Sequence, residues 1–316
     1  MSWAHKMLGR SSIRGCAYRL CGLVAAFFLY SGSQCALADR VIGQQSFFEP
    51  EPFLATDESK PNIVVTIKPL ALIAAELIGD DFTITTLLAP SANPHALAMS
   101  IQERQVLAGA ELVIWLGGRF ERFLVKPMAQ HTTAQLELGA LSTLTWPGRP
   151  QEDLHIWLDI QNVKVILDAL AQQLIALKPL SAQAIQARLQ VALRRLDATD
   201  HQIHRRLSQG REQSFIVSHD GYGHFVNAYG LKQLAAASRL PEEQLSMRKM
   251  VQLNRAGGDP RCLIAEPNER AGARLAAALG LPLILADPLG RDDSITDIHG
   301  LLLALSQRFE TCLQQR

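Results

Sequence analysis

The sequence lacks a charge excess of either sign, with 31 Lys and Arg residues against 30 Asp and Glu. This balance provides no basic face for nucleic acid. Beyond one apolar stretch near the amino terminus, no uncharged segment approaches the about 20 residues that a membrane span needs. The H-E-x-x-H sequence of many zinc hydrolases is also absent. These absences leave small ligands or other proteins as the expected partners.

The amino terminus has the three regions of a secretory signal peptide. The first 19 residues contain no acid and four basic residues, which are Lys6, Arg10, Arg14 and Arg19. An apolar stretch runs from Leu20 to Tyr30, and small residues end in Ala36-Leu37-Ala38. This order predicts a signal peptide over residues 1–38, cleaved after Ala38, and hence a periplasmic location. An uncleaved membrane anchor is the alternative.

Cleavage changes both the charge and the cysteine content. It leaves 278 residues, with 27 of the 31 basic residues against all 30 acidic ones. Cys35 lacks the preceding leucine of a lipobox, so we expect cleavage after Ala38 and a free, soluble protein. A monomer is also expected. Of the five cysteines, only Cys262 and Cys312 remain. Two cysteines in an oxidising compartment predict one disulfide, with two unpaired buried thiols as the alternative.

Short apolar runs alternate with helical patterns on both sides of a long helical zone. The runs at residues 63–67, 82–88, 111–115, 215–217, 262–264 and 283–285 predict strands. Helices are expected near residues 70–77, 100–107, 118–128 and 161–177, and again from residue 181. Alternation of this kind is typical of an α/β protein with parallel sheets. The helical zone lacks a Gly/Ser hinge, so a stiff connection is expected.

These patterns divide the chain into five segments. We predict a signal peptide (1–38), a flexible extension (39–60), an N-terminal α/β lobe (61–159), a linking helix with its following helix (160–210) and a C-terminal α/β lobe (211–316).

Three of the nine histidines lie where ligand sites form in such folds. His95 and His219 each follow a predicted strand, and His155 follows an acidic loop. Ligands bind outside the carboxyl ends of parallel strands. Three imidazoles with a carboxylate or water complete a tetrahedral zinc site, and Asp287 ends a further strand. The spacings match no compact zinc motif, so they do not by themselves select these histidines.

The motifs around these residues resemble one protein family. They are Pro94-His95, His155-Ile156-Trp157-Leu158-Asp159, Ser218-His219-Asp220 with Tyr222-Gly223, Ala265-Glu266-Pro267 and Asp287-Pro288-Leu289-Gly290. In this order they are similar to the ZnuA-like, TroA-type zinc-binding proteins of bacterial ABC importers. The resemblance extends from about residue 61 to the carboxyl terminus.

The resemblance implies two lobes joined by a rigid backbone helix, with Zn²⁺ bound between them and delivered to a membrane permease. It implies that His95, His155 and His219 bind the metal and that Asp287 or water is the fourth ligand. Manganese-binding relatives carry a carboxylate at the position of His219. Because imidazole suits zinc and carboxylates suit manganese, His219 favours zinc. A Cys262–Cys312 disulfide is also implied.

The sequence departs from the family in two places. The segment 146–154 is short and lacks the histidine-rich loop of many zinc-binding members. His224 stands where an aromatic residue is usual, and we interpret it as a packing or surface residue. We expect four histidines to be solvated, and these are His131, His201, His204 and His299. Asp159 and Asp220 are candidates to orient an imidazole, and Asp159 equally to cap a helix.

Other functions remain open from the sequence. A protein of the same fold binding manganese or another divalent metal is one, and an adhesin is another. Three histidines around zinc also suit a hydrolase, but no glutamate stands beside a ligand as an evident general base.

Overall fold

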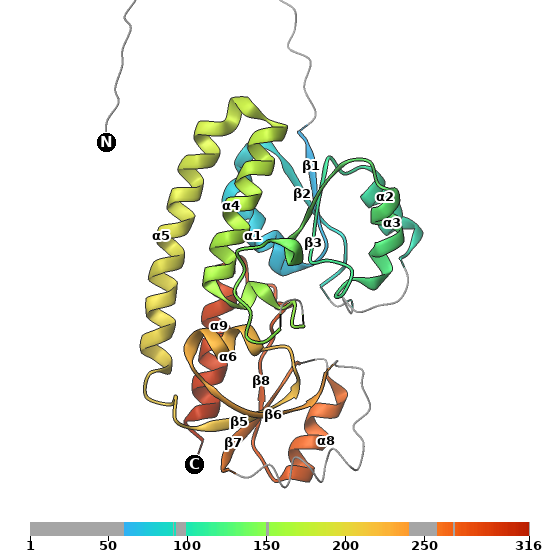
Figure 1. Cartoon of the computed structure of the whole chain (residues 1–316). Coiled ribbons are helices and arrows are strands. Elements are labelled where there is room, and N and C mark those ends of the chain that lie inside the picture. Colours follow the sequence, from blue (N-terminus) through green and yellow to red (C-terminus); the bar gives the residue numbers. More distant parts are fainter. Residues whose placement is uncertain are drawn as a thin grey trace, which may run out of the picture. The chain divides into compact units, whose positions relative to one another are not determined.

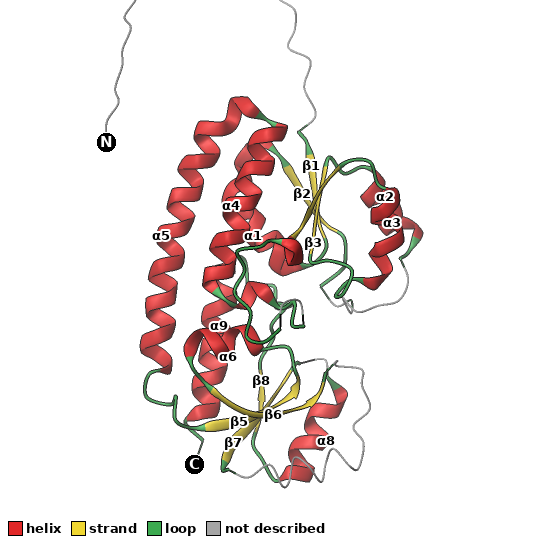
Figure 2. Ribbon diagram, viewed as in Figure 1, coloured by secondary structure: helices red, strands yellow, loops and turns green. Residues whose placement is uncertain are grey.

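The computed structural model describes residues 60–90, 92, 99–149, 152–239, 258–267 and 269–315. Within these ranges the chain forms two α/β lobes, each with a four-stranded parallel sheet (Figure 1 and Figure 2). The α/β prediction is therefore confirmed. The predicted signal peptide and residues 39–59 of the predicted extension lie outside the described residues, and so does His95. No helix in the described part is long and apolar enough to span a membrane.

The N-terminal lobe has its most apolar strand near the middle of the sheet. Its elements are β1 (Asn62–Val65), α1 (Lys68–Ile78), β2 (Thr83–Thr86), α2 (Ile101–Ala108), β3 (Leu112–Trp115), α3 (Val125–Gln130) and β4 (Ala134–Glu137). The strand order is β2-β1-β3-β4. Ile63 of β1 pairs with Ile84 of β2 and Leu112 of β3, and both β1 and β3 are almost entirely buried.

Two helices connect the lobes. They are α4 (Ile160–Leu177) and α5 (Ala182–Leu207), separated by a short turn at Pro179–Ser181. Asp159 caps α4 by accepting a hydrogen bond from the backbone of Gln161 at 2.8 Å. This confirms the capping interpretation, because an N-cap carboxylate satisfies a free N–H of the first turn. Helix α4 begins one residue before the expected start at residue 161. Helix α5 begins one residue after the expected start at residue 181.

The C-terminal lobe repeats the parallel arrangement. Its elements are β5 (Ser214–His219), α6 (Gly223–Tyr229), β6 (Lys232–Ser238), β7 (Pro260–Ala265), α8 (Arg270–Leu279), β8 (Leu283–Leu285) and α9 (Ile298–Leu313). The strand order is β6-β5-β7-β8. Cys262 of β7 and Cys312 of α9 form the predicted disulfide, and both are fully buried.

One hydrophobic core extends through both lobes. It joins β1 and α1 to the inner faces of α4 and α5 and continues into β5, β7 and α9. Two smaller clusters lie on other faces of the sheets, one in each lobe. Because the shared core is continuous, the lobes are packed together along α4 and α5 and are not joined by a loose tether.

The structure corrects the expected elements at three points. Strands β4 and β6 were not predicted, because both are edge strands with polar or alanine-rich sequences and lack an apolar run. The helix expected at 118–128 is also wrong at its start, since α3 begins at Val125 after a 3-10 turn. Glu121 instead folds inward and accepts hydrogen bonds from the backbones of Leu116 and Gly117. Gly117 has a φ of 119°, which a helix does not allow.

Candidate metal centre

His219 is the last residue of β5, an inner strand of the C-terminal sheet. Its side chain is 1% exposed. Gly221, two residues after His219, lies against the imidazole. A Cβ at position 221 would collide with Nε2 of His219. Glycine therefore allows the chain to turn closely around this nitrogen. Tyr222 packs 5.7 Å from the imidazole, centroid to centroid, and donates a hydrogen bond to the carbonyl of Ala286.

His155 comes directly before a 3-10 turn at Ile156–Leu158 and is also buried. Phe120 lies edge-on to its ring at 5.4 Å, and Trp157 packs at 5.2 Å. The indole of Trp157 donates a hydrogen bond to the carbonyl of Pro288, 131 residues further on. This bond ties the segment that carries His155 to the C-terminal lobe.

The two imidazoles meet although 64 residues separate them in the sequence. The ring centroids of His155 and His219 are 5.8 Å apart. Each histidine comes from a different segment, one leading into α4 and one ending β5. The structure thus brings together two of the three predicted imidazole ligands. No set of three His, Cys, Asp or Glu side chains within the described ranges forms a metal-binding group by itself.

Asp153 orients His155. One carboxylate oxygen lies 2.7 Å from Nδ1 of His155 and accepts the backbone N–H of the same residue at 2.9 Å. Burial would raise the pKa of Asp153, but the charge and hydrogen bonds of His155 outweigh it and hold that pKa below its usual range. An ionised carboxylate only accepts, so in the neutral form of His155 the hydrogen is on Nδ1 and Nε2 presents its lone pair.

Sequence reasoning missed Asp153 and selected two other acids for this role. Asp159 instead caps α4 and accepts a hydrogen bond from Thr145. Asp220 is exposed and accepts one from Gln233. The available signal was the D-x-H spacing, because a side chain two residues before a histidine can bind both its backbone and its ring.

Two carboxylates and one guanidinium complete the surroundings. Glu266 is buried at the end of β7, and its Oε1 lies 3.2 Å from Nε2 of His219. Burial raises the pKa of Glu266, although the charge of Arg291 opposes this. Arg291 binds Oε2 of Glu266 at 2.7 Å and Oδ1 of Asp287 at 2.5 Å. Arg291 and Glu266 therefore connect Asp287 to His219.

His224 is a packing residue in the structure, one of the two interpretations, packing or surface, that the sequence left open. It is fully buried, and Trp146 packs 5.7 Å from its ring. The amide of Asn162 donates to Nδ1 at 3.2 Å and also to the carbonyl of Thr145. Nε2 then carries the hydrogen and donates to the carbonyl of Asp153 at 2.9 Å. Both nitrogens are occupied, so His224 supports the His155 segment from α6 without a lone pair for a metal.

Replacing His224 by phenylalanine should lower the free energy of unfolding by about 1–3 kcal/mol. The ring would still pack on Trp146, but the buried Asn162 amide and Asp153 carbonyl would each lose a partner. Urea unfolding of the metal-free protein measures the loss. His224→Gln retains a donor near Nε2 and should lose less. Equal losses in the two variants would show that these hydrogen bonds do not matter.

His299 corrects the expectation that it is solvated. It lies buried in α9, with Nδ1 at 2.9 Å from the hydroxyl of Thr199 in α5 and Nε2 at 3.5 Å from Glu76 in α1. Thr199 donates to a backbone carbonyl, so it accepts from His299. His299 therefore joins three helices, α1, α5 and α9, and has a structural position.

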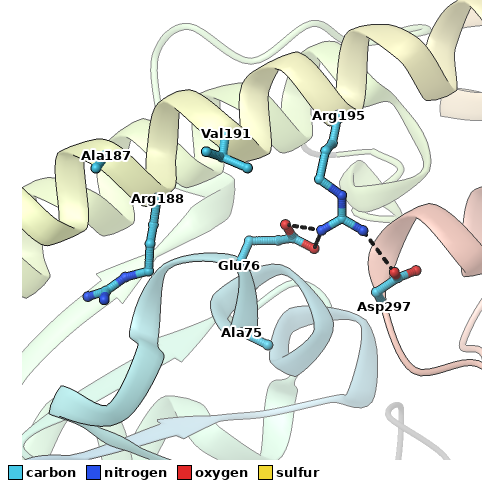
Figure 3. Close-up of a pocket in the computed structure, with 7 residues that line it drawn as sticks. All are labelled: Ala75, Glu76, Ala187, Arg188, Val191, Arg195 and Asp297. Carbon is cyan, nitrogen blue, oxygen red and sulfur yellow. Dashed lines mark hydrogen bonds and ion pairs between the residues drawn. The ribbon is translucent and has the colours of Figure 1, made fainter.

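A hollow of about 490 Å³ lies beside this junction. Figure 3 shows Arg195 of α5 reaching Glu76 of α1 and Asp297 at the start of α9. Arg188 also lines the hollow and binds Asp81. These ion pairs connect the helices of both lobes through α5. We interpret the hollow as part of the junction between the lobes.

Comparison with known proteins decides the family. A profile of the family described as the periplasmic component A of the zinc-uptake complex matches residues 63–300. The chain belongs to this family. The zinc-uptake component A family consists of solute-binding proteins and not of enzymes. Its members act together with an ABC transporter.

Individual relatives share this length and fold. The high-affinity zinc uptake protein ZnuA of Yersinia pestis is 28% identical over 292 residues, covering 80% of this chain and 91% of the relative. The periplasmic zinc-binding protein TroA from Treponema pallidum superposes with a TM-score of 0.71 at 18% identity, covering 82% of this chain and all of TroA. A zinc-bound ZnuA deletion mutant gives 0.70 at 23% identity, with coverages of 82% and 100%. At these identities the two structures show that this chain has the same fold, and they show nothing more.

Proposed function

We propose that this chain captures Zn²⁺ outside the cytoplasm and delivers it to the membrane permease of an ABC importer. The observation that carries the proposal is the meeting of His155 and His219, buried and 5.8 Å apart, from distant parts of the chain. Membership of the zinc-uptake family supports the choice of cargo. Relatives that bind zinc, such as TroA, support it further.

The proposed ligands are the imidazoles of His95, His155 and His219, with Asp287 or water in the fourth position. Asp153 fixes the tautomer of His155 in the form that ligation needs. Three neutral imidazoles and one further donor suit the tetrahedral preference of zinc. An imidazole at position 219 favours zinc over manganese, which prefers oxygen ligands.

The proposed location and partner follow from features outside the metal centre. Cleavage after Ala38 would release the mature chain into the periplasm, where the Cys262–Cys312 disulfide is stable. The continuous core along α4 and α5 supports delivery without wide separation of the lobes. Loop movement around the histidines would then admit and release the metal.

A zinc titration across a range of pH tests this function. The mature protein should take up one Zn²⁺, and its affinity should fall as the pH drops through about 6.5, the ordinary pKa of imidazole. Protons compete with the metal for neutral nitrogens, so the loss approaches about tenfold per pH unit for each imidazole that must deprotonate. A chromophoric chelator measures the competition.

Two results would contradict the proposal. One is zinc affinity that stays constant between neutral and mildly acidic pH, since imidazole ligands must then be absent. The other is ester hydrolysis by the zinc-loaded protein, which would indicate an open, water-activating site. Stronger binding of manganese than zinc would support the alternative cargo instead.

A further inference from the structure

Arg291 is placed between two acids beside the histidine pair. Its side chain is 16% exposed, and its guanidinium bridges Asp287 and Glu266, whose side chains are 18% and 7% exposed. One nitrogen lies 2.5 Å from Oδ1 of Asp287 and another 2.7 Å from Oε2 of Glu266. Such charge-assisted contacts are stronger than neutral hydrogen bonds.

Asp287 has no unused oxygen in this arrangement. Oδ1 accepts from the backbone of Leu289 at 3.1 Å as well as from the Arg291 guanidinium. Oδ2 accepts from the backbone of Arg291 at 2.6 Å. The carboxylate is thus held in its own turn with three of its four lone pairs engaged, and Arg291 partly neutralises the charge that a metal would meet.

Glu266 is held differently. Arg291 binds its Oε2, while Oε1 points toward Nε2 of the expected ligand His219. If Asp287 turns toward a metal, Arg291 still has Glu266 as a buried counter-ion. Glu266 therefore provides the partner that allows Arg291 to release Asp287 without leaving an unpaired buried charge.

We propose that Arg291 determines the metal affinity of this site by competing with the metal for Asp287. This inference rests on the proposed zinc-binding function. A metal at Asp287 either shares the carboxylate with Arg291 or displaces the ion pair, and the positive guanidinium also repels the cation. The zinc affinity is therefore lower than the same ligands would give without Arg291. A lower affinity favours release of the metal to a permease.

The test is a double-mutant cycle on zinc affinity, measured by chelator competition in wild type, Arg291→Gln, Asp287→Asn and the double variant. Arg291→Gln should bind zinc about tenfold more tightly, the size expected for removing one well-screened charge and a competitor. In the Asp287→Asn background the same substitution should give a much smaller gain. Arg291→Lys keeps the charge without the forked geometry and should fall between wild type and Arg291→Gln.

Several outcomes would overturn the inference. Folded Arg291→Gln with unchanged or weaker affinity would show that Arg291 supports the ligands and does not compete with the metal. If Arg291→Gln raises zinc affinity by the same factor in the Asp287→Asn background, Asp287 is not involved. Arg291→Met provides a second neutral variant if Arg291→Gln does not fold, and the same criteria apply to it. If wild type itself takes up no zinc, or if His219→Ala does not weaken it, the proposed function fails first.

Discussion

Replacing His219 by alanine is expected to weaken zinc binding by more than about a hundredfold. Loss of a residue that merely orients a ligand costs about 10–100-fold, so loss of a direct ligand should exceed that range. His219 also lies at the end of a buried strand beside His155 and Glu266, where a water molecule would have to replace the imidazole. The measurement is competition with a chelator of known zinc affinity.

The control for this variant is His201→Ala. His201 is an exposed histidine of α5 and lies outside the motifs that carry the candidate ligands. Its replacement should leave zinc affinity unchanged. Circular dichroism and metal-free unfolding separate a lost ligand from a lost fold in His219→Ala. Unchanged zinc affinity in a folded His219→Ala protein would remove the basis of the proposed metal centre.

Removing the disulfide should produce the largest change in stability. Cys262 and Cys312 are fully buried and close a loop with a sequence separation of 50 residues. The chain-entropy relation gives about 4 kcal/mol for a loop of this length. Replacing both cysteines by alanine should lower the free energy of unfolding by roughly this amount, as measured by urea denaturation at equilibrium.

Zinc affinity provides the matched control for the disulfide variant. The bond joins β7 to α9, whereas the histidine pair lies at the ends of β5 and of the segment that leads into α4. Affinity of the folded variant should therefore stay close to wild type. A loss of stability below about 1 kcal/mol would show that the bond adds little beyond the surrounding packing.

Arg291 and the disulfide illustrate two kinds of support in this fold. The disulfide fastens the carboxyl-terminal helix to its own sheet. Arg291 instead acts within the centre, where it balances two carboxylates close to the imidazoles. Substitution of the two cysteines should change stability with little effect on zinc affinity. Substitution of Arg291 should change zinc affinity. The two sets of experiments can therefore be interpreted separately.

The sequence alone determined the fold class, the central strands and the long helices. Buried parallel strands such as β1 and β3 are continuous apolar runs, so their composition identifies them. The linking helix was equally clear, because its apolar residues recur at helical spacing and Asp159 caps it. The disulfide was predicted from the two cysteines that lie outside the predicted signal peptide. Strands β4 and β6 lacked such signals, because their polar or alanine-rich sequences contain no apolar run.

Only the tertiary structure decided which side chains surround His155 and His219. Their 64-residue separation is closed by packing of both lobes on α4 and α5, which no local pattern encodes. The same packing buries His299 at a helix junction and places Arg291 across Glu266 and Asp287. Periodicity reports which face of an element is buried, whereas contacts between distant elements depend on how those faces fit together. The sequence thus proposed His155 and His219 as candidate ligands, and the fold decided what surrounds them.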